Sequence, residues 1–190
     1  PLVSRAGKIA VIGPNADSDS LTRKQYGPSK MPVTTVLAGL RQVFGADRIL
    51  TAKGCDVVDA GFPMTEVLPQ PMSDAERKLL DEAVAMARQA DFVVAVLGDG
   101  TRTTGESKSR TSLELPGRQE ALLEALSGTG KPVVLVLLNG RPMSINWAEK
   151  NVPAILIGWI PGMMTGQAIA EAIAGEINPS GKLPCTWIRT

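Results

Sequence analysis

The sequence contains no histidine among its 190 residues. Histidine is the general base of Ser-His-Asp and Cys-His catalytic arrangements, so its absence excludes those mechanisms and leaves carboxylates, lysines and one tyrosine as acid/base groups. A zinc site of the usual kind is disfavoured too, because the only two cysteines, Cys55 and Cys185, lie far apart and form no CxxC pair. We therefore predict no metal and no cofactor. Spacing alone leaves open whether the two cysteines pair.

The chain also has little net charge and no long apolar run. The chain has 20 basic and 19 acidic residues, a net charge of +1, and only 4% aromatic residues, which disfavours a nucleic-acid partner. No apolar run, 133–138 included, approaches the roughly 20 residues that span a membrane, so we predict no membrane partner. With 44% hydrophobic residues, the chain is long enough to bury the core of one domain.

The beginning of the chain lacks an initiator methionine and a charged-then-apolar leader. We therefore expect the sequence to be a piece of a longer protein. Residues 1–7 are predicted to be a linker from a preceding domain, and residues 8–190 to form one domain.

Short apolar runs alternate with segments of helical periodicity along this domain. The predicted strands are 8–13, 48–52, 92–97, 132–138 and 154–157. The predicted helices are 36–44 with a cap at Thr34 or Thr35, one behind the capping-box sequence 73–76, one opened by Pro116 and ended by Gly128, a short one at 147–150, and 162–174. Segments 18–32 and 54–72 are predicted to be loops, and 183–188 an extended tail. This alternation predicts an α/β sandwich: a doubly wound, mostly parallel sheet with helices on both faces.

The polar loop after the third predicted strand is the strongest candidate site, because ligands bind outside the carboxyl ends of strands in open α/β sheets. Its middle carries the carboxylate of Glu106, between Gly105 and Ser107. A glutamate in such a loop is usually only solvated, so the residue type alone does not assign a role. Other polar residues at strand ends or in this loop are candidates for substrate binding or loop positioning: Asp99, Lys108, Arg110, Asn139 and Arg141.

Nucleotide binding is the first alternative that this fold suggests, and the motifs disfavour it. The turn after the first strand reads GPNAD at 13–17, where a dinucleotide site needs G-x-G-x-x-G. The Gly-Lys pairs at 130–131 and 181–182 lack the leading glycine and the following Ser or Thr of a phosphate loop. Both pairs are better interpreted as turns.

Four ordered motifs resemble the family 3 glycoside hydrolases, the β-glucosidases and related exo-acting enzymes. The segments ESKSR at 106–110 and LELPGRQ at 113–119 are similar to that family's E-x-S-x-R…L-x-L-P-G-x-Q. The similarity continues in KPVVLV with NGRP at 131–142, in NPSGKLP at 178–184 and in KIAVIGPNA at 8–16. Departures occur at GMMTG, 162–166, and at WIR, 187–189. The resemblance spans almost the whole chain.

The resemblance implies a specific division of labour. In that family an N-terminal (β/α)8 barrel carries an aspartate nucleophile, and an α/β sandwich domain supplies the acid/base carboxylate from a loop. This chain resembles the second domain only, and Glu106 matches the acid/base position. The implied function is that of the acid/base-supplying domain of a retaining exo-acting β-glycosidase, a β-glucosidase, which is inactive without its barrel.

The implied partners are a β-linked glucoside or oligosaccharide and the barrel of the same protein, and the implied location is periplasmic or secreted. The alternative is a non-catalytic module that binds a carbohydrate or a partner, in which Glu106 only orients a loop.

Overall fold

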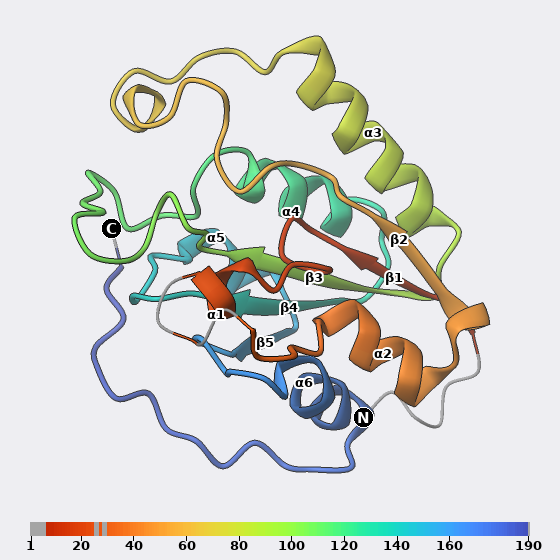
Figure 1. The fold of residues 1–190 in the computed structure, drawn as a ribbon. Helices are drawn as coiled ribbons and strands as arrows, with labels where there is room; N and C mark the ends of the chain where they lie inside the picture. The colour runs from red at the N-terminus through yellow and green to blue at the C-terminus, as the bar shows by residue number, and fades with distance from the viewer. Residues whose placement is uncertain (1–6, 25–26, 28–29, 190) are drawn as a thin grey trace.

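The sheet at the centre of the molecule has five strands in the order β2-β1-β3-β4-β5, and every pairing is parallel (Figure 1). The computed structural model describes residues 7–24, 27 and 30–189. The strands are β1 (Ile9–Ile12), β2 (Ile49–Ala52), β3 (Phe92–Gly98), β4 (Val133–Leu138) and β5 (Ala154–Ile157). Apart from Gly7, the predicted linker 1–7 lies outside the described residues.

Helices cover both faces of this sheet, which confirms the predicted doubly wound α/β sandwich (Figure 1). One face packs against α2 (Val36–Phe44) and α6 (Thr165–Ala174), and the other against α3 (Asp74–Arg88), α4 (Gln119–Ser127) and α5 (Asn146–Asn151). Successive residues of a strand point to opposite faces, so the wholly buried β3 supplies both cores. Its side chains divide into Phe92, Val94 and Val96 on the α2 and α6 side, and Val93, Ala95 and Leu97 on the other.

The predicted helix caps are present. The Thr35 side chain accepts the amide N–H of Ala38 at 3.2 Å, and Gly45 ends α2. Ser73 and Glu76 form the reciprocal capping box at the start of α3. The sequence was sufficient to predict these caps because each cap involves only residues within one helical turn.

Helices α2 and α6 are in close contact. A Cβ added to Gly39 would lie 2.1 Å from the carbonyl oxygen of Gly166, and one added to Gly166 would lie 1.9 Å from the carbonyl oxygen of Thr35. The amide N–H of Gly166 donates to the Thr34 carbonyl at 2.8 Å. The two helices therefore meet backbone to backbone, which only glycine at both positions permits.

Two helices begin later than the sequence predicts. Helix α4 starts at Gln119 rather than at Pro116, because residues 116–118 turn against the loop after β2. Gly117 has φ 63°, and a Cβ there would lie 2.9 Å from the amide nitrogen of Asp59. Helix α6 starts at Thr165 rather than at position 162, and the Thr165 hydroxyl donates to the carbonyl of Gly162 at 2.5 Å.

Segment 18–32, predicted to be a loop, contains the one-turn helix α1 (Ser20–Lys24). The carbonyl of Asp19 accepts the amide N–H groups of Thr22 and Arg23, and Leu21 is buried. Residues 25, 26, 28 and 29 of this segment lie outside the described residues. Five residues are too few to show helical periodicity, and burial of one leucine stabilises the turn.

The long segment 54–72 is irregular, as predicted, apart from the short 3-10 helix η2 (Met64–Glu66). In the tail, residues 183–188 pair with no strand in the described part of the chain. The Ser144 hydroxyl donates to the carbonyl of Ile188 at 2.9 Å, which ties the end of the tail to the domain. Every helix in the described ranges is too short or too polar to cross a bilayer.

Both cysteines are free thiols. Cys55 is buried and Cys185 is exposed. Burial raises the pKa of the Cys55 thiol to about 12, with the neighbouring carboxylate of Asp56 adding to the shift. Cys55 is therefore a protonated, unreactive core residue at neutral pH.

Candidate active site

The loop that joins β3 to α4 presents Glu106 at the tip of a tight turn. The amide N–H of Lys108 donates to the carbonyl of Gly105 at 3.2 Å, so Glu106 and Ser107 are the central residues of the turn. Ser107 has φ 59°, the left-handed conformation that a type II turn needs at its third residue. The Glu106 side chain is exposed, and its carboxylate has no hydrogen bond or ion pair within the described residues. It is free to meet a group that approaches from outside.

Asp99 and Asn139 lie beneath this loop, where both are fully buried. The carboxylate of Asp99 accepts the hydroxyl of Thr103 at 2.7 Å and the amide N–H of Gly140 at 3.0 Å. The Asn139 amide donates to the carbonyl of Arg141 at 2.7 Å. The buried carboxylate thus joins the loop after β3 to the loop after β4.

Arg141 holds the tip of the β3–α4 loop by its main chain. One terminal nitrogen of the guanidinium, Nη2, donates to the carbonyl of Thr103 at 2.6 Å and to the carbonyl of Lys108 at 2.9 Å. These carbonyls stand on either side of Glu106 in the sequence. The Lys108 side chain itself is exposed. We refer to Asp99, Asn139 and Arg141 together as the loop clamp.

Arg110 anchors the loop from the opposite end. Its Nε lies 2.6 Å from Oε1 of Glu66, and the two side chains are only 1% and 7% exposed. Arg110 also donates to the carbonyl of Glu114 at 2.9 Å, while Glu66 accepts the amide and hydroxyl of Thr111 at 3.1 and 2.9 Å. This buried pair connects the β3–α4 loop to segment 54–72 and places Arg110 out of reach of a ligand at the surface.

The pKa of Glu66 predicts how this anchor depends on pH. Burial alone would raise the pKa, but hydrogen bonds from Arg110 and Thr111 and the positive charge of Arg110 outweigh it, so the pKa falls below its ordinary value of 4.5. A lowered pKa in the folded state contributes stability above pH 4.5, and that stability is lost as pH falls through the folded value. We expect Glu66→Gln to lower stability at neutral pH and to flatten its decline below pH 4.5, measured by urea unfolding across pH. A decline as steep as in the wild type would contradict this assignment.

Two residues of this region were not predicted to contribute to the site. Gln119 is fully buried, and its side chain accepts the amide N–H of Gly98 at 2.7 Å and donates to the carbonyls of Gly98 and Val57 at 2.8 and 2.9 Å. The sequence did offer a signal for this residue, because Gln119 is polar whereas the other residues on the inward face of the same helix are leucines. Glu66 gave no such signal, because its partner Arg110 lies 44 residues away.

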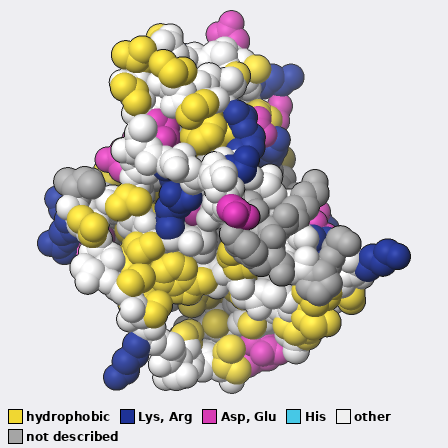
Figure 2. Space-filling model, turned by 60° about the vertical axis from the view of Figure 1, so that its left-hand side comes forward, with side chains coloured by type: hydrophobic (Ala, Val, Ile, Leu, Met, Phe, Trp, Pro, Cys, Tyr) yellow, Lys and Arg dark blue, Asp and Glu magenta, His cyan; other side chains and the backbone are white. Residues whose placement is uncertain are grey.

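The surface on this side of the molecule mixes both charge signs with apolar areas (Figure 2). Among residues 7–24, 27 and 30–189, no group of three or more Cys, Asp or Glu side chains is placed to hold a metal ion. The chemistry that the tip of the loop offers is that of the exposed Glu106 carboxylate.

Fold and site together define a class: a parallel α/β domain that presents an exposed carboxylate on an anchored loop at the carboxyl edge of its sheet. The sequence family described as Glycosyl hydrolase family 3 C-terminal domain matches residues 1–190. The chain belongs to this family, which confirms the resemblance of the four motifs.

Relatives and solved structures agree with this membership. The chain is 40% identical to a β-xylosidase of Formosa agariphila over 98% of its own length and 25% of that protein. It is 38% identical to a periplasmic β-glucosidase of Salmonella typhimurium, over 99% of the chain and 26% of that protein. A β-glucosidase involved in saponin metabolism from intestinal bacteria superposes with a TM-score of 0.80 at 37% identity, covering 96% of this chain and 29% of that one. The chain thus spans about a quarter of the length of the curated relatives.

Proposed function

We propose that this chain is the acid/base-supplying domain of a retaining β-glycosidase and that Glu106 is the acid/base group. The observation that supports this assignment is the geometry of the turn: an exposed carboxylate with no partner among the described residues, on a loop whose main chain is held on both sides by Arg141. A proton donor must reach the glycosidic oxygen and yet keep a fixed position, and this arrangement satisfies both requirements.

Retaining hydrolysis requires a second carboxylate about 5–5.5 Å from the first. We propose that an aspartate on a (β/α)8 barrel elsewhere in the protein provides it. In the first step that aspartate attacks the anomeric carbon while protonated Glu106 donates its proton to the leaving oxygen. In the second step a water molecule attacks the anomeric carbon while the Glu106 carboxylate takes its proton, and the aspartate leaves.

The loop clamp and Arg110 have a positioning role in this proposal. Asp99, Asn139 and the Arg110 side chain are buried, so they act through the loop rather than on the sugar. Lys108 is exposed two residues after Glu106 and is the candidate among the five for direct contact with substrate.

The substrate class in this proposal is a β-linked neutral sugar released from a chain end. The relatives include a β-xylosidase and a periplasmic β-glucosidase, so glucose and xylose are the two sugars to compare. By the same likeness, we propose a periplasmic or secreted location.

The full-length protein provides the test. We expect it to hydrolyse p-nitrophenyl β-glucoside, β-xyloside or both, and to release the β-anomer first, as proton NMR of the fresh product would show. The isolated 190-residue chain is expected to be inactive on the same substrates. First release of the α-anomer would contradict a retaining mechanism, and no hydrolysis by the full-length protein would favour a non-catalytic binding module.

A further inference from the structure

The turn formed by η2 and the two residues after it carries apolar side chains on its outer side. The amide N–H groups of Val67 and Leu68 donate to the carbonyl of Met64 at 3.1 and 2.9 Å, so the three residues belong to one helical turn. Residues three and four positions apart lie on the same side of such a turn. The exposed fractions of Met64, Val67 and Leu68 are 60%, 60% and 58%. We refer to these three side chains as the η2 face.

The polar side chains of the same turn are held on its inner side. The hydroxyl of Thr65 donates to the two carboxylate oxygens of Asp59 at 2.7 and 2.9 Å. Glu66 lies 2.6 Å from the guanidinium of Arg110, and both of these side chains are nearly inaccessible to solvent. Surface turns ordinarily show the reverse arrangement, with polar side chains outside and apolar ones inside. Such a reversal is expected where another molecule or domain covers the apolar side.

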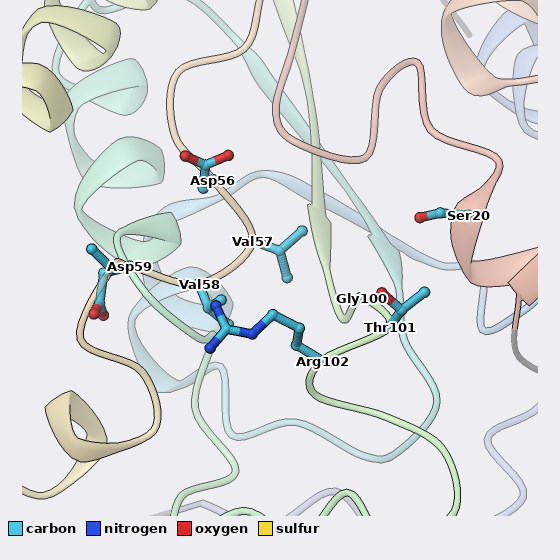
Figure 3. Close-up of a pocket in the computed structure, with 9 residues that line it drawn as sticks. Ser20, Asp56, Val57, Val58, Asp59, Gly100, Thr101 and Arg102 are labelled. Carbon is cyan, nitrogen blue, oxygen red and sulfur yellow. The ribbon is translucent and has the colours of Figure 1, made fainter.

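Further contacts fix the segment that carries η2 beside the β3–α4 loop. One terminal nitrogen of Arg102 donates to the carbonyl of Phe62 at 3.1 Å, and the guanidinium carbon lies 5.2 Å from the centre of the Phe62 ring. Figure 3 shows Arg102 extending from the start of that loop toward segment 56–60. Because these contacts already order the segment, covering the η2 face costs little conformational freedom.

We propose that the η2 face is a docking surface for the (β/α)8 barrel of the same protein. The inference rests on the proposed function, in which an aspartate of that barrel comes within about 5–5.5 Å of Glu106. Glu66 contacts Arg110, whose Cα lies within about 15 Å of that of Glu106, because the two residues are four positions apart. A barrel that presents its aspartate to Glu106 therefore also lies close to the η2 face.

The size of the relatives and the chemistry of the face agree with this occupant. The chain spans 25% and 26% of two curated relatives, so those proteins have room for a barrel beside a domain of this kind. The three side chains of the η2 face carry no charge and no strong hydrogen-bonding group, so the matching surface is an apolar patch at the rim of the barrel. Covering them removes apolar area from water and stabilises the contact between the two domains.

Alkylation of an introduced cysteine tests whether the face is covered. Val67→Cys and, as the matched control, Ala85→Cys are made in the full-length protein together with Cys185→Ser, which removes the exposed thiol of this domain. Ala85 is exposed near the end of α3 that leads into β3, at the opposite edge of the sheet. We expect iodoacetamide to modify position 67 at least about tenfold more slowly than position 85 at every protein concentration, measured on the modified peptides by mass spectrometry. Equal rates would overturn the proposal, and so would protection that disappears on dilution, which would assign the face to a second copy.

Photo-cross-linking identifies the surface that covers the face. Met64 is replaced by p-benzoylphenylalanine in the full-length protein, and the peptide joined to it after irradiation is identified by mass spectrometry. We expect this peptide to belong to the barrel, in a product of monomer size. A product of dimer size, or a cross-link only within residues 1–190, would contradict docking of the barrel on this face.

Activity of the full-length protein gives a third readout. In Val67→Asp a carboxylate must be buried against an apolar patch, so we expect weaker docking and a loss of kcat/KM of about tenfold on both a p-nitrophenyl glycoside and a disaccharide. Ala85→Asp should behave as the wild type. Full activity of Val67→Asp would argue against the surface. Alkylation and cross-linking do not depend on catalysis, so an inactive wild type would remove the proposed function while these two measurements still decide whether the barrel covers the face.

Discussion

Replacing Glu106 by glutamine in the full-length protein is expected to lower kcat on an unactivated glycoside by about 10²–10⁴-fold, the usual contribution of general acid/base catalysis. Glutamine has nearly the same shape as glutamate but neither donates the required proton nor takes one from water. The turn that presents position 106 is held through main-chain atoms, so the substitution leaves the loop in place. The measurement is steady-state hydrolysis of a disaccharide by the two proteins.

Two substrates with different leaving groups give a more specific test of this prediction. Dinitrophenolate departs from a dinitrophenyl glycoside without being protonated. Glu106→Gln is therefore expected to slow the first step with this substrate much less than with a disaccharide. Azide needs no general base, so it should restore turnover of the dinitrophenyl substrate and yield the β-glycosyl azide. Glu114→Gln is the matched control, an exposed carboxylate of the same loop, and it should behave as the wild type. Equal losses on both substrates, or no loss at all, would refute the role of Glu106.

The second large effect is expected at the contact between α2 and α6. Gly→Ala in the interior of a helix ordinarily stabilises a protein by about 1 kcal/mol. At Gly39 the added Cβ would lie 2.1 Å from the carbonyl oxygen of Gly166, so the helices must separate. We expect Gly39→Ala to destabilise the domain by about 1–3 kcal/mol, measured as a lower midpoint in urea unfolding.

Gly181→Ala is the control for that substitution, because a Cβ there meets nothing within 4 Å. Its effect should be within about 0.5 kcal/mol of zero. A higher unfolding midpoint for Gly39→Ala would show that intrinsic helix propensity outweighs the contact, and would contradict the close packing of α2 on α6.

The sheet and its main helices could be predicted because their signals are local and repeated. Strand β3 is a continuous apolar run, and the caps at Thr35 and Ser73 act within one turn. The start of α4 could not be predicted, because Pro116 suits both a helix start and a turn. The choice between them is made by the close approach of Gly117 to Asp59, which is 58 residues away in sequence (117 − 59).

The position of Glu106 on an exposed loop at the carboxyl edge could be predicted from the order of strand and loop. The contacts that hold this loop in place could not. Arg141 contacts carbonyl groups 38 and 33 residues earlier in the chain, and every residue type has a carbonyl, so no sequence pattern marks the partners. Likewise, nothing near Arg110 identifies Glu66 as its ion-pair partner. Long-range contacts to main-chain atoms become visible only when the sheet has brought the strand ends together.

Because Arg141 holds the loop by backbone oxygens, the exposed side chains of residues 106–109 are not needed to keep the loop in shape. This stretch is therefore a suitable target for directed evolution. Libraries that keep Glu106 and vary exposed neighbours such as Lys108 and Ser109 should retain a high proportion of folded members, whereas libraries at buried Asp99 or Asn139 should not. The same attachment lets the residues at the tip vary while the support underneath stays unchanged.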